Sequence, residues 1–197
     1  MLSQLHLRHN YEAMSSDTLK LYITPAHPCS YLAGKQTRSL FLEPNIEVTG
    51  DLYSQLNQMG FRRSGKYVYK PKCDDCQACM SSRVRAQDFT PSRSQKRIQK
   101  RNQHLQTKLL DAEQVRAAYP LYERYINGRH SDGDMYPANR QQFESFLLET
   151  LESTRFVGFF NDDELVCVAI VDCVVNGLSA LYTFYEPSLS RNALGVN

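Results

Sequence analysis

Residues 155–185 read RFVGFFNDDELVCVAIVDCVVNGLSALYTFY, and this stretch decides the fold of the second half of the chain. Three runs rich in β-branched, aromatic and other apolar residues are separated by turn residues, which is typical of short antiparallel strands. The connections are expected at residues 161–163 and at Asn176 and Gly177, and the Asn-Gly pair is a strong signal for a two-residue hairpin. The strands of this meander are predicted at residues 155–160, 165–173 and 178–185.

Two helical patterns precede the meander. Apolar residues recur with helical spacing in residues 112–130, where Pro120 is expected to kink or divide the helix, and again in residues 141–151. The segment SDGDMYP between them, residues 131–137, predicts a turn because two aspartates flank a glycine. Helices followed by an antiparallel meander indicate an α+β domain of the acetyltransferase-like (GNAT) type, in which an acyl donor binds beside the central strands. The inward-facing residues of the second helix are predicted to be Phe143, Phe146, Leu147 and Leu151.

The first half of the chain predicts a smaller unit of mixed structure. Alternating apolar residues predict strands at residues 19–24, 38–42 and 66–71. Thr49 is expected to cap a helix that continues to Met59 and stops before a glycine. The expected organisation is a poorly ordered extension at 1–16, a mixed unit with a cysteine cluster at 17–90, a basic helix at 91–108 and the acetyltransferase-like domain at 109–197.

Composition places the chain among ordinary globular proteins. Apolar residues make up 42% and charged residues 22% of 197 positions, which argues against fibrous and disordered classes. No run of about 18 apolar residues is present, and the opening MLSQLHLRHN lacks the apolar stretch of a signal peptide. We therefore expect a cytoplasmic protein without a membrane partner, in which the six cysteines are thiols or metal ligands rather than disulfides.

The net charge of +2 hides a strong asymmetry between the two halves. Residues 1–108 hold 17 Lys and Arg against 8 Asp and Glu, whereas residues 109–197 hold 6 against 13. A basic half is expected for a protein that binds a polyanion, because neutralising phosphates supplies most of the sequence-independent affinity for nucleic acid. The alternative is a contact between the two oppositely charged halves.

A cysteine cluster, PKCDDCQACM, lies in the basic half. Cys73, Cys76 and Cys79 have the two-residue spacing that lets thiolates converge on one metal ion, and Cys29 in HPCSY is the candidate for a fourth ligand. Cys167 and Cys173 lie in an apolar strand pattern, where a thiol behaves as a small hydrophobic group. The cluster therefore predicts a structural zinc or iron–sulfur site, and the alternative is a set of reduced thiols that pack a tight loop.

A cationic helix is predicted directly after the cluster, in FTPSRSQKRIQKRNQHL. Ser92 is suited to cap it, and five cations then recur at spacings that place them on one helical face. Like charges at these spacings repel, so such a stripe favours a role in binding phosphate over that of a solvated face. The cationic stripe consists of Arg93, Lys96, Arg97, Lys100 and Arg101.

Five blocks together resemble the bacterial aspartate/glutamate leucyltransferase branch of the arginyl-tRNA protein transferase family. They are HPCSYL, GFRRSGKYVYKPKCDDCQAC, FTPSRSQKRIQKRN, RHSDGDMYP and GLSALYTFYEPSLSRNALG. The resemblance implies an aminoacyltransferase that conjugates leucine from leucyl-tRNA to proteins beginning with Asp or Glu and so marks them for degradation by the N-end rule. It implies a tRNA partner rather than DNA. Family members continue beyond the segment NALGVN, so the resemblance also leads us to expect a chain shortened at its C-terminus, with an incomplete sheet.

The implied reaction is attack of a protein α-amine on the ester carbonyl of the aminoacyl-tRNA. It needs a base and a hydrogen-bond donor for the oxyanion, but no covalent intermediate and no cofactor. Acids in the matching blocks are candidates for the base or for holding the ammonium group, and tyrosines are candidates for hydroxyl donors or a stacking face. Each has an ordinary alternative role in a turn, a strand end or the core. These candidates are Asp132, Asp134, Glu186, Tyr136, Tyr182 and Tyr185.

Recognition of an acidic N-terminal residue requires a cation, and a guanidinium offers two parallel donors to a carboxylate. The candidates within the matching blocks are Arg62, Arg63, Arg129 and His130. Two other readings remain open beside leucyl transfer. One is arginyl transfer by the same mechanism, and the other is a metal-ribbon module that binds RNA without catalysis. An acyl-CoA acetyltransferase is disfavoured, because SRNALG offers only Gly195 to a pyrophosphate.

Overall fold

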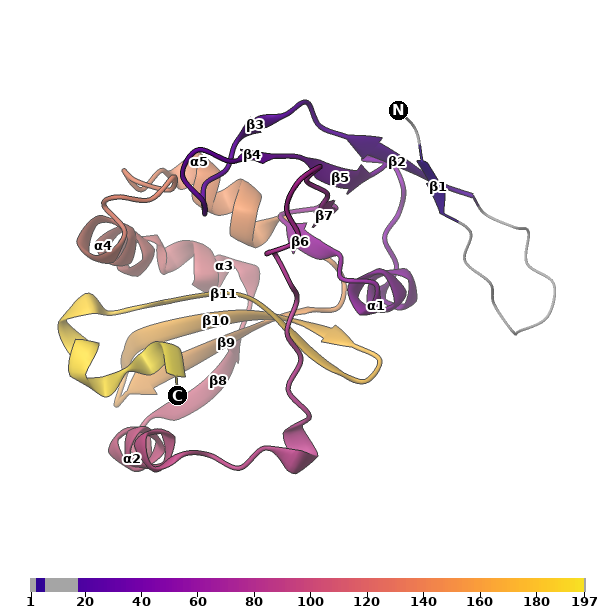
Figure 1. Cartoon of the computed structure of the whole chain (residues 1–197). Helices are drawn as coiled ribbons and strands as arrows, with labels where there is room; N and C mark the ends of the chain where they lie inside the picture. Colours follow the sequence, from indigo (N-terminus) through magenta and orange to yellow (C-terminus); the bar gives the residue numbers. More distant parts are fainter. Residues whose placement is uncertain (1–2, 6–17, 197) are drawn as a thin grey trace. The chain divides into compact units, whose positions relative to one another are not determined.

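A computed structural model describes residues 3–5 and 18–196, which form two compact units that divide between Ser81 and Ser82 (Figure 1). The basic helix falls in the second unit, together with the helices and the meander that follow it. Most of the predicted N-terminal extension, residues 1–16, lies outside the described residues. In the described part of the chain, no helix is long and apolar enough to span a membrane.

The first unit contains a five-stranded antiparallel sheet with the strand order β1-β2-β5-β7-β6. Three of its strands confirm the patterns found in the sequence, whereas β1 and β6 were not predicted. The latter two are three-residue strands, too short to show an alternating pattern. The strands are β1 Ser3–Leu5, β2 Leu19–Ile23, β5 Ser39–Leu42, β6 Arg62–Ser64 and β7 Tyr67–Pro71.

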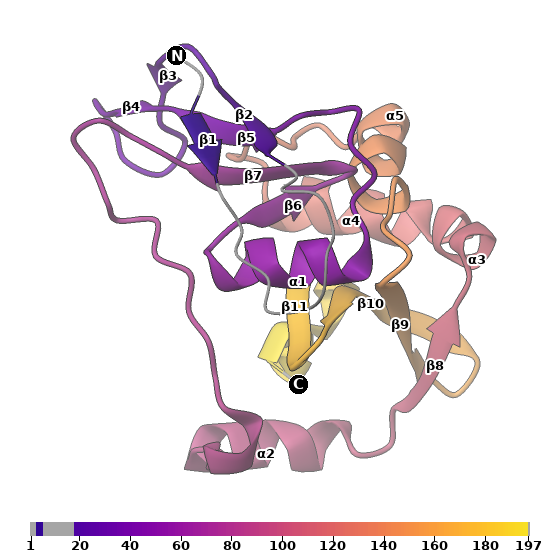
Figure 2. The ribbon, with the colours of Figure 1, turned by 90° about the vertical axis from the view of Figure 1, so that its right-hand side faces the viewer.

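Helix α1, Gly50–Gln58, lies beside this sheet (Figures 1 and 2). Its bounds confirm the prediction, since the Thr49 hydroxyl accepts a hydrogen bond from the Leu52 amide at 3.2 Å and caps the first turn. Gly60 follows with a φ of +85°, a conformation that favours glycine. The unit's core combines α1 with the sheet and includes Leu21, Leu42, Tyr53, Leu56, Phe61 and Val68.

A small hairpin and an extended loop complete the first unit. The hairpin pairs β3, His27–Pro28, with β4, Gln36–Thr37. The loop follows β7 and carries three of the four cysteines proposed as metal ligands, while Cys29 comes directly after β3. The Cys29 amide donates to the Lys35 carbonyl at 2.9 Å, which ties that cysteine to the hairpin.

The second unit is built on a four-stranded antiparallel sheet with the order β11-β10-β9-β8. The predicted meander is confirmed, but its hairpin loop is displaced by one residue: Val174 pairs with Gly177, so the loop is Val175 and Asn176. Strand β8 was not predicted, because its stability comes from backbone pairing with β9 rather than from its own pattern. The strands are β8 Gln106–Leu110, β9 Thr154–Asn161, β10 Glu164–Val174 and β11 Gly177–Tyr185.

Helices α3, Ala112–Ala117, and α4, Tyr119–Arg129, confirm that Pro120 divides the first helical pattern. Proline is tolerated at the start of α4 because the amide it lacks would have no partner in the first turn. The predicted helix at 141–151 begins within one residue of its expected start but ends early, at Leu148. It consists of α5, Arg140–Phe143, and a π-helical turn, Glu144–Leu148, which closes where the Glu149 amide donates to the Glu144 carbonyl.

These helices pack on one face of the sheet, and α2, Arg93–Asn102, lies on the other side (Figures 1 and 2). The core on the helical face joins Tyr122, Ile126, Phe143 and Leu147 to Val168 and Ile170 of β10 and Phe184 of β11. A smaller cluster contains Val166, Cys167 and Leu194, with Leu105 packed against it. Cys173 is exposed, which corrects the expectation that both strand cysteines act as small hydrophobic groups, whereas Cys167 is buried as expected.

Two short 3-10 segments follow β11, namely η3, Pro187–Asn192, and η4, Leu194–Val196. A third, η1, Ala86–Asp88, precedes α2. The basic helix predicted at 91–108 is too long, since α2 ends at Asn102 and the chain enters β8 at Gln106. The physical reason is the edge of β9, which gives residues 106–110 a backbone partner that a longer helix would forgo.

Candidate functional site

The cationic helix α2 is fixed at its start by a capping box. The Ser92 hydroxyl accepts from the Gln95 amide at 3.3 Å, and the Gln95 side chain accepts from the Ser92 amide at 2.8 Å. Two amides of the first turn, which would otherwise lack partners, are thereby satisfied. The local sequence therefore fixes the start of the helix that carries the five predicted cations.

All five cations of the stripe are exposed. Within residues 18–196, none of them pairs with a carboxylate, and α2 itself contains no acid. The Arg101 guanidinium donates to the backbone carbonyl of Arg191, which consumes a donor but neutralises no charge. The helix thus presents a concentrated positive surface that an external polyanion can neutralise.

The second feature is a pocket in the first unit, about 320 Å³ in volume. All four cysteines proposed as metal ligands line it, together with Arg62, Lys35 and Tyr31. A smaller pocket of about 150 Å³ shares four of these residues, so the two form one continuous recess. The shared residues are Cys29, Tyr31, Arg62 and Cys79.

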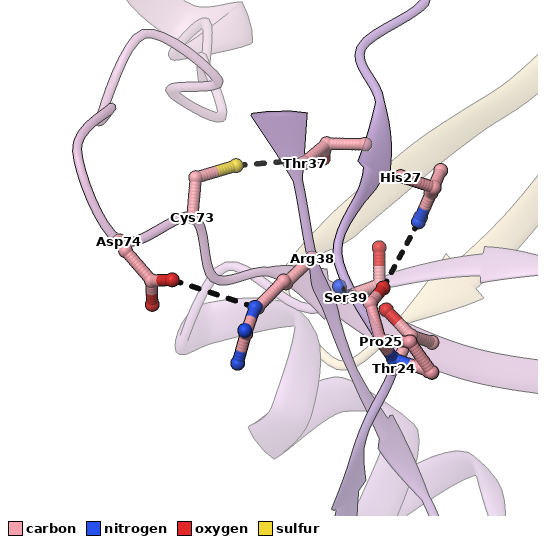
Figure 3. A network of polar contacts seen from close by, with 8 residues as sticks. All are labelled: Thr24, Pro25, His27, Thr37, Arg38, Ser39, Cys73 and Asp74. Carbon is pink, nitrogen blue, oxygen red and sulfur yellow. Dashed lines mark hydrogen bonds and ion pairs between the residues drawn. The ribbon is translucent and has the colours of Figure 1, made fainter. Parts of the chain in front are cut away.

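Cys73 lies beside polar groups of the neighbouring strand and loop (Figure 3). The Thr37 hydroxyl lies 3.4 Å from its Sγ, and this hydrogen bond, with one from the Arg38 backbone, lowers the pKa of the thiol. Arg38 also forms an ion pair with Asp74, at 3.4 Å from its Nε. A lowered pKa favours the thiolate, which is the form that binds metals.

The metal prediction concerns four thiols that line the same pocket. The four thiols line one recess, but no three His, Cys, Asp or Glu side chains of the described residues are arranged so that they already surround an ion. A metal would therefore require the loop that carries Cys73, Cys76 and Cys79 to tighten. The site stays a prediction.

The arginines predicted to bind the acceptor differ in accessibility. Arg62 is half-buried, lines the recess and donates from Nη2 to the Cys79 carbonyl at 3.1 Å. Arg63 on the next position of β6 is only 3% exposed and donates to the Gly65 carbonyl at 2.7 Å. Of this adjacent pair, only Arg62 faces a space that a carboxylate could enter.

The remaining cationic candidates lie in the second unit, where α4 ends. Arg129 and His130 are both exposed. Nε2 of His130 lies 3.0 Å from the Tyr125 hydroxyl, and the two rings meet edge to face. This contact holds the imidazole against the aromatic core, beside the turn that carries Asp132 and Asp134.

That turn presents its acids to solvent. Asp132, Asp134 and Tyr136 are exposed, and the amide of Tyr136 donates to the carbonyl of Gly133 at 3.0 Å, which confirms the predicted turn. Ala138 after the turn donates from its amide to the side chain of Asn127 on α4 at 3.1 Å. The turn is thus fixed to α4 while its carboxylates remain available to an external group.

Glu186, by contrast, is fully engaged. Its Oε2 accepts from Nε of Arg124 at 2.9 Å, and its Oε1 accepts from the amide and the hydroxyl of Ser188 at 3.2 and 2.9 Å. Burial raises the pKa of this carboxyl, but these hydrogen bonds and the Arg124 charge outweigh burial and leave the pKa below its ordinary value. Glu186 is therefore a weak base that fixes the end of β11 to α4.

The strand tyrosines belong to an aromatic cluster. Tyr182 packs against Tyr122, Tyr125 and Phe146, with ring centroids 5.3–6.5 Å apart, and burial raises its pKa well above the ordinary value. Tyr185 packs against Tyr125 at 4.8 Å. The raised pKa keeps the Tyr182 hydroxyl protonated, so it is suited to donating a hydrogen bond rather than to accepting a proton.

Several residues of the site have no signal in the sequence. Arg124 lies in an ordinary helical pattern, yet it holds Glu186 across 62 positions. The Tyr122 hydroxyl is buried without a hydrogen-bond partner among the described residues, and burial raises its pKa to about 12. Such pairings depend on the three-dimensional arrangement, so no local pattern indicates them.

Comparison with known proteins identifies the class of protein. The family description "Arginine-tRNA-protein transferase, N terminus" matches residues 27–97, and "Arginine-tRNA-protein transferase, C terminus" matches residues 117–197. The chain belongs to the arginine-tRNA-protein transferase family.

Three similar proteins belong to one branch of this family. The chain is 46% identical over 179 residues to a protein of Hahella chejuensis, covering 91% of this chain and 76% of that protein. A protein of Teredinibacter turnerae is 49% identical over 90% of this chain and 73% of its own length, and one of Alcanivorax borkumensis is 47% identical over 91% and 74%. All three are aspartate/glutamate leucyltransferases, which are aminoacyltransferases.

Proposed function

We propose that this chain transfers leucine from leucyl-tRNA to the N-terminus of proteins that begin with Asp or Glu. The observation that carries the proposal is the exposed cationic stripe of α2, which lacks carboxylate partners among the described residues, in a chain whose relatives are leucyltransferases. Neutralising tRNA phosphates would remove the repulsion within the stripe. Charged tRNA and nascent proteins meet in the cytoplasm, where we place the reaction.

In the proposed reaction the neutral α-amine of the acceptor attacks the ester carbonyl of leucyl-tRNA. An amide bond forms, the ester bond to the tRNA ribose breaks, and the ribose oxygen leaves as a hydroxyl. The exposed carboxylates of Asp132 and Asp134 are the acids that remain free to take the ammonium proton or to hold the amine. Glu186 is assigned a positioning role, because Arg124 and Ser188 already occupy its oxygens.

Arg62 is the candidate in the first unit for binding the acidic side chain of the acceptor. Its guanidinium borders a recess, and one of its donor groups is anchored on the Cys79 carbonyl, which fixes the orientation of the remaining donors. Lys35 on the same recess adds a second positive charge. Arg129 and His130 are the alternative cations, in the second unit.

We also propose that the second unit has the acetyltransferase-like arrangement. Support comes from the order of its elements, in which β8 is followed by α3, α4 and α5 and then by the meander β9-β10-β11. The tyrosines of β11 would then lie beside the aminoacyl group. The protonated hydroxyl of Tyr182 is suited to donate to a developing oxyanion.

The four cysteines are proposed to hold a structural zinc ion or iron–sulfur cluster. Thiolate ligands suit both, and the hydrogen bonds to Cys73 favour its thiolate. The bound metal or cluster would tighten the loop that carries Cys79, whose carbonyl accepts a hydrogen bond from Arg62. Elemental analysis of the purified chain tests this directly, and a metal content that does not fall when Cys76 is replaced by Ser would remove the assignment.

The transfer itself is tested with radiolabelled leucyl-tRNA and peptides that differ only in their first residue. We expect leucine incorporation into peptides beginning with Asp or Glu and none into a peptide beginning with Gly. Arginyl-tRNA in place of leucyl-tRNA tests the arginyl alternative. Binding of tRNA without transfer from either donor would favour the non-catalytic RNA-binding module.

The stripe is tested separately, by changing Lys96, Arg97 and Lys100 together to Ala. We expect tRNA affinity to fall and its dependence on salt to weaken, because each lost phosphate contact lowers the slope of log K against log salt by about 0.7–0.9. Equal affinity of the variant and the unchanged chain would refute the assignment of α2.

A further inference from the structure

The end of α2 is joined to the segment after β11 by a reciprocal pair of amides. Asn102 donates from Nδ2 to the Asn192 carbonyl at 2.8 Å, and Asn192 donates from its own Nδ2 to Oδ1 of Asn102 at 3.1 Å. Asn102 is 3% exposed and is the buried residue of an otherwise accessible helix. A buried amide is costly unless its partners are in place, so this pair defines one docked position for α2.

Apolar packing and a second polar contact support the same position. Leu105, just beyond α2, packs against the cluster of Val166, Cys167 and Leu194. The Arg101 guanidinium donates to the carbonyl of Arg191, the neighbour of Asn192. Two successive residues of α2 therefore contact two successive residues of η3, ninety positions away.

This docking brings a further cation to the stripe. The backbone of Arg191 lies within hydrogen-bond reach of the Arg101 guanidinium, and the Arg191 side chain is exposed. Between residues 18 and 196, the Arg191 side chain has neither a carboxylate nor a carbonyl partner. A further unpaired guanidinium near the Arg101 end of the stripe adds to its positive charge, which favours binding of an anion there.

Ala193 adds an indication that the position of η3 is specified. It adopts a φ of +50° and a ψ of +48°, a left-handed conformation that is unfavourable for a residue with a side chain. Its amide donates to the Ser190 carbonyl at 3.1 Å, and the Val196 amide donates to the Ala193 carbonyl at 2.9 Å. These contacts turn the chain sharply after Asn192 and hold the Arg191 end of η3 against α2.

We infer that the tRNA-binding surface has a second row, supplied by η3, in which Arg191 binds a backbone phosphate of the same RNA as the α2 stripe. Asn102 and Asn192 are positioning residues that align this row with the helix. The inference rests on the proposed role of α2 in binding tRNA. It adds a sixth cation from a part of the chain that the sequence does not connect with the stripe.

The experiment measures the dissociation constant of leucyl-tRNA against potassium chloride concentration for the full chain. Arg191→Ala is expected to weaken binding about fivefold near 0.15 M salt and to lower the salt slope by about 0.7–0.9, the effect of one phosphate contact. Arg191→Glu should weaken binding further. Both changes are at an exposed side chain, so circular dichroism should show the same fold for each variant.

Arg155→Ala is the matched control, because it removes the same charge from the same unit. Arg155 lies near the start of β9. The chain leaves α2 and enters β8 at Gln106, which pairs with Phe160 near the other end of β9. At about 3.3 Å per residue, Arg155 and Phe160 are roughly 16 Å apart along the strand. It is expected to leave the dissociation constant within about twofold. An Arg191→Ala effect no larger than that of Arg155→Ala would overturn the inference.

A double-mutant cycle tests the positioning residues. In the Asn102→Ala background, the α2–η3 register is released, so Arg191→Ala should cost less than about twofold instead of about fivefold. A merely structural role for Asn102 predicts additive losses, which would remove the positioning role. Asn192→Ala, which removes the donor to Asn102 without adding a charge, provides the same test should Asn102→Ala not fold.

The outcomes separate this inference from the function on which it rests. If the triple change in α2 weakens tRNA binding and Arg191→Ala does not, the helix alone binds the RNA and the second row is refuted. If neither change affects binding, the assignment of α2 itself fails. Loss of affinity in both, with a coupled effect of Asn102, is the result that we expect.

Discussion

A carboxylate that sequence comparison suggests as a base can instead be held as an anion by its neighbours, and Glu186 illustrates this. Arg124 and Ser188 supply three hydrogen bonds to its two oxygens, and the pKa falls although burial alone would raise it. Cys73 illustrates the same physics for a thiol, because the Thr37 hydroxyl and a backbone amide favour its ionised form. In both cases the hydrogen-bond donors, not the residue type, decide the chemistry.

The first prediction concerns Glu186→Gln. Loss of the charge should reduce the free energy of unfolding by about 1 kcal/mol at pH 7, a modest value because Arg124 is half exposed and screened by solvent. Since the folded-state pKa is lowered, the stabilisation is present above the ordinary pKa of 4.5 and is lost as pH falls through the lowered value.

Urea unfolding at pH 7 and at pH 3.5 measures this difference. Glu164→Gln, at the exposed start of β10, serves as the control and should change little at either pH. A difference between Glu186→Gln and the unchanged chain that persists undiminished in acid would contradict the role of the charge.

The second prediction concerns the thiol of Cys73. Thr37→Val removes the hydroxyl that lowers its pKa, so alkylation of Cys73 by iodoacetamide at pH 7 should slow roughly two- to fivefold in metal-free protein. Mass spectrometry of the labelled peptides follows each cysteine separately, and Cys76 provides an internal control. Equal slowing at both cysteines would point to a general change in the loop instead.

Among the strands and helices, strong local signals were predictable and partner-dependent ones were not. The caps Thr49 and Ser92, the break at Pro120 and the apolar runs of the meander lie in the sequence itself, and each marks a helix start or strand that the structure confirms. Strand β8 and the π-helical turn at Glu144–Leu148 depend on contacts with other parts of the chain. No local pattern could therefore reveal them.

The third prediction concerns the packing of β8 on β9. A Cβ at Gly158 would lie 2.9 Å from Cδ1 of Leu110 and 3.0 Å from the Phe160 ring, so Gly158→Ala should destabilise the fold by roughly 1–3 kcal/mol. Gly177→Ala is the control, since a Cβ there meets no atom within 4 Å. The midpoints of thermal unfolding of the two variants are compared. Equal midpoints would show that β8 can move away from the added methyl group without loss of stability.

The candidate site was predictable to a different degree in each unit. The stripe of α2 and three of the cysteines follow from spacing, and Cys29 was added because the other two cysteines lie in an apolar strand pattern. The structure presents the stripe as one exposed surface and the four cysteines as the lining of one recess. The choice between Arg62 and Arg63 could not be predicted, because their burial depends on the sheet around β6. The same holds for Arg124 and Asn102, whose partners lie far along the chain.

At the scale of the whole chain, the main feature is its division into two compact units. The segment from residue 80 to residue 90 crosses the division, and every residue in it is exposed. Charge is divided in a similar way, since the basic residues gather before residue 109 and the acidic ones after it. The basic helix nevertheless belongs structurally to the acidic part of the chain, which the charge pattern alone does not reveal.

The fourth prediction follows from this exposed segment. Brief trypsin treatment should cut first after Arg83 or Arg85, because protease access requires an extended, accessible backbone, whereas the cations of α2 lie in a helix. Mass spectrometry of the first two fragments identifies the position of the cut. An initial cut within β9, β10 or β11 would show that the sheet opens more readily than the connecting segment.

The amide pair between Asn102 and Asn192 has a consequence for the order of folding. Each hairpin of the meander closes over a few residues, whereas this pair closes a loop of ninety, which is the entropically slower event. A nascent chain therefore displays α2 on the ribosome well before Arg191 has been synthesised. The full cationic surface therefore forms only after Arg191 has emerged from the ribosome, ninety residues of synthesis after its partner on α2.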